Sequence, residues 1–239
     1  GSGPGSAASY PQSGGVSWDI TLFWPGNPAP NFASYDVLVI HSGEAFRTGA
    51  PGGPNATPNY SGILSNKSAI EAARGNRTFV SGSDADHHAV RGDSGLCPRV
   101  HCGDFDGARG YVINAVNWTA GGAGLGILSF YHGEFPGAYW WDHPDSFLRS
   151  ELLGNWANLS RDENNAVIPA SAVDYPVNAG LSSAGLSNWT NSFHGRFSNI
   201  PGYVSTVDSG SNPGLSLSIA TIALCRPAPG IYCLAATVG

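Results

Sequence analysis

Ionisable side chains are concentrated in one stretch of the chain, residues 77–109. A short apolar run at 78–80 leads into a small-residue turn at 81–83, which is followed by carboxylates, imidazoles and two thiols. In open α/β sheets, ligands bind outside the carboxyl ends of the strands, so this stretch is where we expect a binding or catalytic site. Its carboxylate and imidazole side chains are Asp84, Asp86, His87, His88, His101, Asp104 and Asp106.

These seven side chains are candidate ligands of a divalent metal ion. Carboxylate oxygens favour calcium, whereas a mixed set of imidazoles and carboxylates favours zinc. Residues 104–107 (DFDG) resemble part of a calcium loop, but the remaining ligand positions of such a loop are missing. In the alternative interpretation, Asp84 and Asp86 cap turns or helix starts, the histidines are solvated or hydrogen-bonded, and no cofactor is expected.

Histidine and glutamate residues also follow two other predicted strands, at 35–41 and 125–131. On one sheet edge they would form a cleft of acids and bases, as hydrolysis requires. Polar loop residues gather at a sheet edge without any function as well. The sequence therefore assigns no catalytic residue, and the candidates for an enzyme are His41, Glu44, Asp84, His87, His132 and Glu134.

Strand and helix patterns alternate in the first part of the chain. Helical patterns at 65–74 and 108–119 separate the apolar runs at 35–41, 78–80 and 125–131, and this order predicts a parallel sheet with helices on its faces. The other predictions are strands at 16–24 and 215–224, a helix at 146–153, a surface loop at 193–203, and a hairpin partner for 215–224 at 232–238.

The run YDVLVIHSGEAF, a following helix and the run GNRTFVSGSDADHHA resemble the class I glutamine amidotransferase-like fold, especially its ThuA-like branch, over about residues 16–154. The resemblance implies an α/β fold, a flavodoxin-like three-layer sandwich with a mostly parallel sheet. It does not carry the activity over, because that chemistry needs a cysteine on a strand-to-helix elbow, and residues 81–86 read SGSDAD. Ser81 or Ser83 is a poor substitute, since the flanking pattern is not G-x-S-x-G.

Composition divides the chain into three segments and indicates its environment. Residues 1–15 form an extended Gly/Ser/Pro arm, 16–154 the amidotransferase-like domain, and 155–239 a loop-rich extension whose C-terminal β hairpin packs on the same domain. Only 12% of residues are charged, the net charge is −6 and no basic cluster occurs, so we expect neither nucleic acid nor membrane insertion. The charge-poor surface and the absence of methionine predict a secreted or cell-surface protein whose export signal has been removed.

The cysteines, sequons and tryptophans each permit two interpretations. The cysteines predict two disulfides, Cys97 with Cys102 and Cys225 with Cys233, and zinc ligation involving the first pair and His101 is the alternative. Sequons make glycosylation candidates of Asn55, Asn59, Asn66, Asn76, Asn117, Asn158 and Asn188, provided that the host has the machinery. The tryptophans either stack on sugars or belong to the core, and they are Trp118, Trp140, Trp141, Trp156 and Trp189.

Together these features favour a secreted structural or cell-surface protein with a catalytically degenerate amidotransferase-like domain. Its expected partners are copies of itself, assembled into a filament or layer through the N-terminal arm and the β strands. The first alternative is an extracellular, metal-assisted hydrolase that uses the Asp/His/Glu cleft. The second is a carbohydrate-binding protein, which depends on the tryptophans alone.

Deletion of residues 1–15 should stop self-assembly and leave the monomer folded, because an arm of small residues has no side chains with which to build a core. Electron microscopy measures the assembly, and circular dichroism of the same sample checks the fold. Filaments or layers formed by the truncated protein would contradict this prediction.

Overall fold

The computed structural model describes residues 18–23, 27–42, 60–86, 88–89, 106–131, 140–189 and 193–222. Its strands are β1 Val37–Ile40, β2 Arg74–Ser81, β3 Leu125–Ser129, β4 Trp156–Glu163, β5 Ala166–Val167, β6 Phe193–Phe197, β7 Tyr203–Ser209 and β8 Ser216–Thr221. Its α-helices are α1 Ser61–Leu64, α2 Lys67–Ala73, α4 Asp106–Ala120, α5 Arg149–Leu152 and α6 Ser183–Leu186. Short 3₁₀ turns are η2 Phe32–Ser34, η4 Trp140–Asp142, η5 Ala170–Ala172 and η6 Pro176–Asn178.

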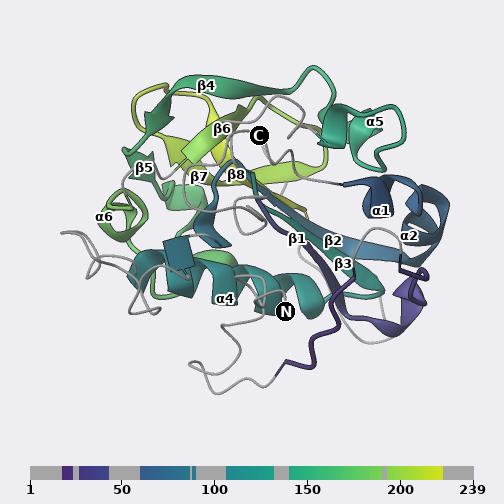
Figure 1. Cartoon of the computed structure of the whole chain (residues 1–239). Helices are drawn as coiled ribbons and strands as arrows, with labels where there is room; N and C mark the ends of the chain where they lie inside the picture. The colour runs from purple at the N-terminus through teal and green to yellow at the C-terminus, as the bar shows by residue number, and fades with distance from the viewer. Residues whose placement is uncertain are drawn as a thin grey trace, which may run out of the picture.

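The described strands form one mixed sheet in the order β1-β3-β2-β8-β6-β4, with β7 beside β8 and β5 beside β7 (Figure 1). β3 runs parallel to both β1 and β2, so the α/β class is confirmed. The prediction of a mostly parallel sheet is wrong, because every pairing that involves β4 to β8 is antiparallel. Short connections such as the one between β7 and β8 allow only antiparallel neighbours, whereas a parallel pair needs a long crossover.

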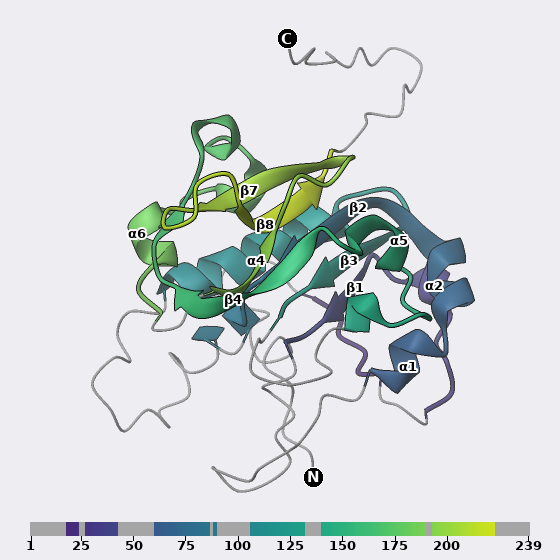
Figure 2. The ribbon, with the colours of Figure 1, turned by 90° about the horizontal axis from the view of Figure 1, so that it is seen from above.

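The two faces of the parallel strands carry different helices. Phe79 and Leu128 point to the face covered by α4, where they share a core with its buried residues. Their neighbours in sequence, Val80 and Ile127, point to the other face and pack with residues of α2 and the α5 region. Figures 1 and 2 show α4 along one side of the sheet and α1, α2 and α5 grouped away from it. This alternation follows from the two-residue period of a strand.

Several predicted elements are present and others are not. β1, α2, α4, β3 and β8 confirm the predictions at 35–41, 65–74, 108–119, 125–131 and 215–224. Of the helix predicted at 146–153, only α5 is present, and residues 18–23, from the strand predicted at 16–24, contain no strand. The prediction of a surface loop at 193–203 is wrong, because the first five of these residues are the buried strand β6. β8 lies between β2 and β7 along 218–220, and its predicted partner at 232–238 lies outside the described residues.

A contact between two glycines joins β6 to the end of β2. The N–H groups of His194 and Gly195 donate to the Gly82 carbonyl at 2.7 and 2.9 Å. A Cβ atom on Gly82 would lie 2.1 Å from the Gly195 oxygen, so only glycine fits there. The close approach places His194, on β6, beside the turn that follows β2.

Replacing Gly82 with Ala should lower the free energy of unfolding by ~2 kcal/mol or more, because the added methyl group meets backbone that has no room to move. Urea denaturation measures the effect. Gly110→Ala is the matched control: its Cβ meets only the flexible Leu181 side chain, and alanine is the better helix former. Equal stability of the Gly82→Ala variant and the wild type would disprove the steric role of this contact.

Candidate active site

Asp84 lies at the junction between a strand and a helix. β2 ends at Ser81, Gly82 and Ser83 form the turn, and the described residues from 85 to 89 are helical. The His88 N–H donates to the Asp84 carbonyl at 3.2 Å, which closes the first helical turn. Asp84 is only 2% exposed, so its carboxylate is buried at the carboxyl end of a parallel strand.

Two imidazoles contact the same oxygen of this carboxylate. The Nε2 atoms of His194 and His88 each lie 3.1 Å from Asp84 Oδ1. His88 follows Asp84 by four residues, a spacing that puts both side chains on one helix face. His194 comes from β6, and both histidines are buried. The carboxylate is therefore held between a local and a long-range partner.

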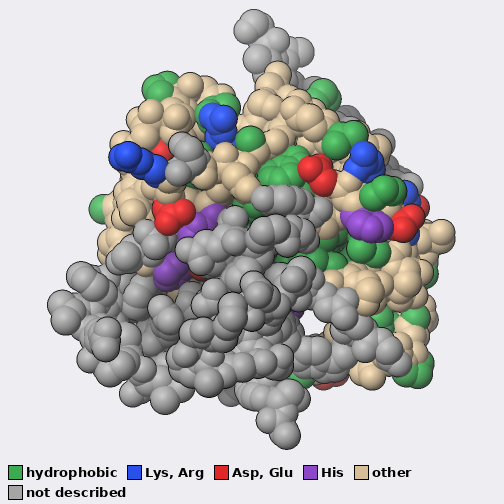
Figure 3. Space-filling view, turned by 45° about the horizontal axis from the view of Figure 1, so that its top comes forward, with side chains coloured by type: hydrophobic (Ala, Val, Ile, Leu, Met, Phe, Trp, Pro, Cys, Tyr) green, Lys and Arg blue, Asp and Glu red, His purple; other side chains and the backbone are tan. Residues whose placement is uncertain are grey.

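A second carboxylate continues the row toward the surface. Nδ1 of His194 lies 2.9 Å from Oδ1 of Asp162, which belongs to β4. The Asp162 side chain is 33% exposed, whereas His194 is buried. The space-filling view in Figure 3 shows histidine side chains beside acidic ones on this face of the molecule. The order Asp84, His194, Asp162 thus runs from the core outward.

Charge interactions fix the protonation of this row. Burial alone would lower the pKa of His194, but the hydrogen bonds and the charges of Asp84 and Asp162 raise it to about 9. Burial would raise the pKa of Asp84, but its hydrogen bond to His194 and its close contact with His88 hold that pKa well below the usual range. At neutral pH, a buried carboxylate therefore faces a buried imidazolium.

A second group of ionisable residues lies where β1 ends. Oδ2 of Asp86 accepts the backbone N–H of Ser42 at 2.9 Å, which ties the end of β1 to the helical turn after β2. Burial, together with the charge of Asp86, raises the pKa of Tyr60. Burial lowers the pKa of His41 to about 4, so this imidazole is neutral at physiological pH.

The serines of the turn belong to a buried hydroxyl network. Ser81 Oγ lies 2.8 Å from Ser83 Oγ and 2.9 Å from Tyr111 Oη, and all three residues are fully buried. These bonds connect the turn to α4 beneath it. They favour a structural role for the two hydroxyls and leave Asp84 as the better nucleophile candidate.

The structure brings some of the sequence candidates together. His41, Asp84, Asp86 and His88 all lie at the carboxyl edge of β1 and β2. Outside the described residues are Glu44, His87, His101, Asp104, His132, Glu134, the cysteines Cys97, Cys102, Cys225 and Cys233, and the sequon residues Asn55 and Asn59. Asp106 begins α4, but its side chain is outside the described set. Among the described side chains, no group of three is arranged to hold a metal ion. The calcium or zinc site stays a prediction.

Sequence reasoning missed His194 and Asp162. The signal for His194 was present, because Phe193 and Phe197 alternate with polar residues as in a half-buried strand. Nothing in the sequence around Asp162 points to a site. Its role depends on the pairing of β4 with β6, in which Glu163 lies opposite Phe193.

Most of the tryptophans belong to the core. Trp140, Trp141 and Trp189 are buried, Trp118 is 6% exposed and only Trp156 is partly exposed. Their rings pack against other aromatic rings, such as Trp141 against Tyr131 at 5.2 Å. Stacking on a sugar requires an open ring face, so this arrangement disfavours sugar binding by four of the five tryptophans.

The described sequon residues differ in what their amides contact. Asn66 Nδ2 donates to the Gly62 carbonyl at 2.7 Å. In three other sequons the amide oxygen Oδ1 is an acceptor: Asn76 accepts from the N–H of Ala123, Asn117 from the indole of Trp18, and Asn158 from the hydroxyl of Tyr131. Asn188 is exposed. Glycosylation of these residues stays a prediction.

Comparison with protein-family models, curated proteins and solved structures found no match to this chain. The amidotransferase resemblance therefore stays a prediction from the sequence. None of the described helices is long and apolar enough to span a bilayer.

The free energy of unfolding should fall by about 3 kcal/mol as the pH rises from 6.5 to 9, because the pKa of His194 is about 9 in the folded state and 6.5 in the unfolded state. Its stabilising contribution is complete below pH 6.5 and is lost as the pH passes 9. His194→Gln should abolish this slope, and His143→Gln, at an exposed histidine outside the site, should retain it. Urea denaturation across this range measures the slope. A wild-type profile that is flat between pH 6.5 and 9 would contradict the assignment.

Proposed function

We propose that this protein is a hydrolase in which Asp84 is a covalent nucleophile, His194 transfers protons and Asp162 orients the imidazole. The observation that carries the proposal is the row in which His194 contacts Asp84 through Nε2 and Asp162 through Nδ1. A nucleophile, a histidine and an orienting carboxylate in hydrogen-bond reach form the arrangement used in triad catalysis on unrelated folds.

The position of Asp84 supports this role. Nucleophiles of α/β hydrolases lie on the sharp turn between a strand and a helix, which is where Asp84 lies. A carboxylate must be ionised in order to attack, and the two imidazoles keep the pKa of Asp84 low. The same histidines could serve only to pin β6 to β2. Catalysis is favoured because two further groups with shifted pKa values, His41 and Tyr60, lie at this same edge of the sheet.

The reaction takes two balanced steps. First, an Asp84 carboxylate oxygen attacks an electrophilic carbon of the substrate, the bond from that carbon to a leaving oxygen breaks, and the His194 imidazolium gives the leaving oxygen its proton. Asp84 is then a neutral ester and His194 a neutral imidazole. Second, His194 accepts a proton from water while the water cleaves the ester, which restores both groups. The net reaction consumes one water molecule.

A carboxylate nucleophile suits a saturated carbon that bears an oxygen leaving group, such as the anomeric carbon of a glycoside. The raised pKa of His194 suits the first step, in which it acts as an acid. Esterification of Asp84 removes one of the two negative charges that raise this pKa, so the pKa of His194 falls as the ester forms. The imidazolium therefore gives up its proton to the leaving oxygen in the first step. It is neutral, and able to accept a proton from water, when the second step begins.

The other expectations from the sequence remain proposals. Helices on both faces of the parallel block β1, β3 and β2 support the flavodoxin-like three-layer arrangement. Secretion is argued from composition alone. Self-assembly, binding of further copies or of carbohydrate, and disulfide formation involve segments outside the described residues, including the arm at 1–15.

A panel of dinitrophenyl glycosides tests the proposal, because their leaving group needs no proton and the first step can then proceed without His194. The wild type should turn over continuously. His194→Gln should release about one equivalent of dinitrophenol per chain and then stop, with the substrate fragment attached to Asp84 in the intact mass spectrum. Asp84→Asn should release none, and Asp162→Asn should slow turnover at least tenfold.

His143→Gln is the control for replacing a histidine and should match the wild type. Circular dichroism and thermal melting establish that each variant is folded. Wild-type turnover that persists in Asp84→Asn, or the lack of any turnover by the wild type across the panel, would overturn the proposal.

A further inference from the structure

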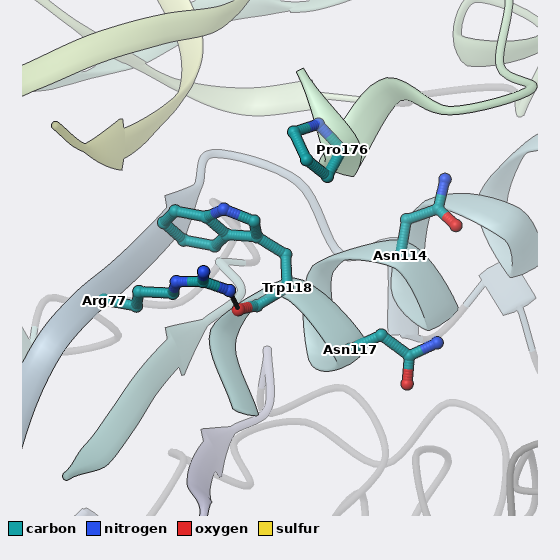
Figure 4. A pocket seen from close by; sticks show the side chains of 5 residues that line it. All are labelled: Arg77, Asn114, Asn117, Trp118 and Pro176. Atoms are coloured by element: carbon teal, nitrogen blue, oxygen red, sulfur yellow. Dashed lines mark hydrogen bonds between the residues drawn. The ribbon is translucent and has the colours of Figure 1, made fainter. Parts of the chain in front are cut away.

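A pocket of about 310 Å³ lies at the edge of the sheet away from Asp84, where α4 ends beside the first half of β2 (Figure 4). Its lining comes from β2, α4 and η6. The residues are Arg77, Asn114, Asn117, Trp118 and Pro176. The volume is at the lower end of the range for small-molecule sites.

Arg77 is held in a fixed orientation on one wall of this pocket. One Nη group donates to the carbonyl of Trp118, and the guanidinium carbon lies 5.2 Å from the centre of the Trp118 indole (Figure 4). The glycines after α4 make room for the side chain: a Cβ atom on Gly122 would lie 2.9 Å from Arg77 Cγ. The contact with the last carbonyls of α4 is favourable for a cation, and this explains the orientation without a ligand.

That structural role leaves most of the guanidinium donors unused. Within the described part of the chain, Arg77 forms no ion pair with a carboxylate, and its buried Nε has no hydrogen-bond partner. The pocket lining contains no acidic residue. An atom this buried is closed to the pocket, so the donors open to a ligand are those on the Nη groups that the Trp118 carbonyl does not use.

The neighbouring side chains restrict which class of ligand the pocket can bind. Trp118 is only 6% exposed and contacts both Arg77 and Tyr175, whose ring centre is 5.5 Å away, so the indole has no open face for a sugar. Asn117 is exposed and contributes an amide, and Pro176 adds an apolar wall. One permanent positive charge matches a singly charged anion better than a phosphate dianion. A planar carboxylate also fits the fork of a guanidinium.

We propose that this pocket binds the carboxylate group of a small organic acid, with Arg77 as the charge partner, Asn117 as a further polar contact and Pro176 against the apolar part of the ligand. The site is separate from the row formed by Asp84, His194 and Asp162. It does not depend on the proposed hydrolase activity.

Benzoate is the probe, and benzamide, which has the same shape without the charge, is the matched control. Isothermal titration calorimetry of the full chain should show saturable binding of benzoate and at least tenfold weaker binding of benzamide. Inorganic phosphate should bind more weakly than benzoate. Failure of benzoate to bind, or equal binding of benzamide, would overturn the proposal.

Two variants locate the binding. Arg77→Gln should weaken benzoate binding at least tenfold. Asn117→Asp should do the same by placing a negative charge at the pocket, while it keeps the acceptor for Trp18 and changes only an exposed residue. His143→Gln, at an exposed histidine that does not line the pocket, should bind benzoate as the wild type does. Undiminished binding in the folded Asn117→Asp variant, or loss of binding in His143→Gln, would contradict the assignment to this pocket.

Discussion

The backbone contact between Gly82 and Gly195 is the constraint on which the candidate site depends. Because neither residue has a side chain, β6 approaches the end of β2 closely enough for two N–H groups to share the Gly82 carbonyl. The Gly82 N–H in turn donates to Leu217 of β8 at 2.8 Å, so the turn is bonded on both sides. A side chain at Gly82 would collide with the Gly195 backbone and push β6 away from the end of β2. His194 would then move away from Asp84.

The buried charges at this junction require such precision. A lone carboxylate in the core is costly, and an imidazolium is costly as well, but each offsets the desolvation of the other when they are in contact. Asp84 has two imidazole partners, and Asp162 adds a second negative charge at the outer end of the row. The charge on His194 stabilises the fold once Asp84 is buried beside it, but apolar residues of the same volume in place of the whole pair are often as stable or more so. Stability alone therefore does not explain why these charges lie at the end of a central strand.

The sequence predicted the part of the site that is local in the chain. Asp84, Asp86 and His88 follow an apolar strand within a few residues, and His41 ends a four-residue aliphatic run, so strand ends alone located them. His194 could not be placed in this way, because it reaches Asp84 across 110 residues through a β6 whose apolar pattern is short. Of the antiparallel strands, only β8 was predicted, at 215–224. The others were missed because β7 is rich in Ser and Thr and the apolar patterns of β4 and β6 are short, so that packing rather than composition determines them.

α4 is the element shared by the two sites proposed here. Near its beginning, Tyr111 bonds to Ser81 in the turn beneath Asp84, and near its end, Trp118 packs against Arg77. Between them its buried face rests on Phe79 and Leu128 of the parallel strands. A helix packed in this way along a sheet cannot shift at one end without disturbing the core, because protein interiors are close-packed. The geometry of both edges of the sheet is therefore determined by the same layer of side chains under α4.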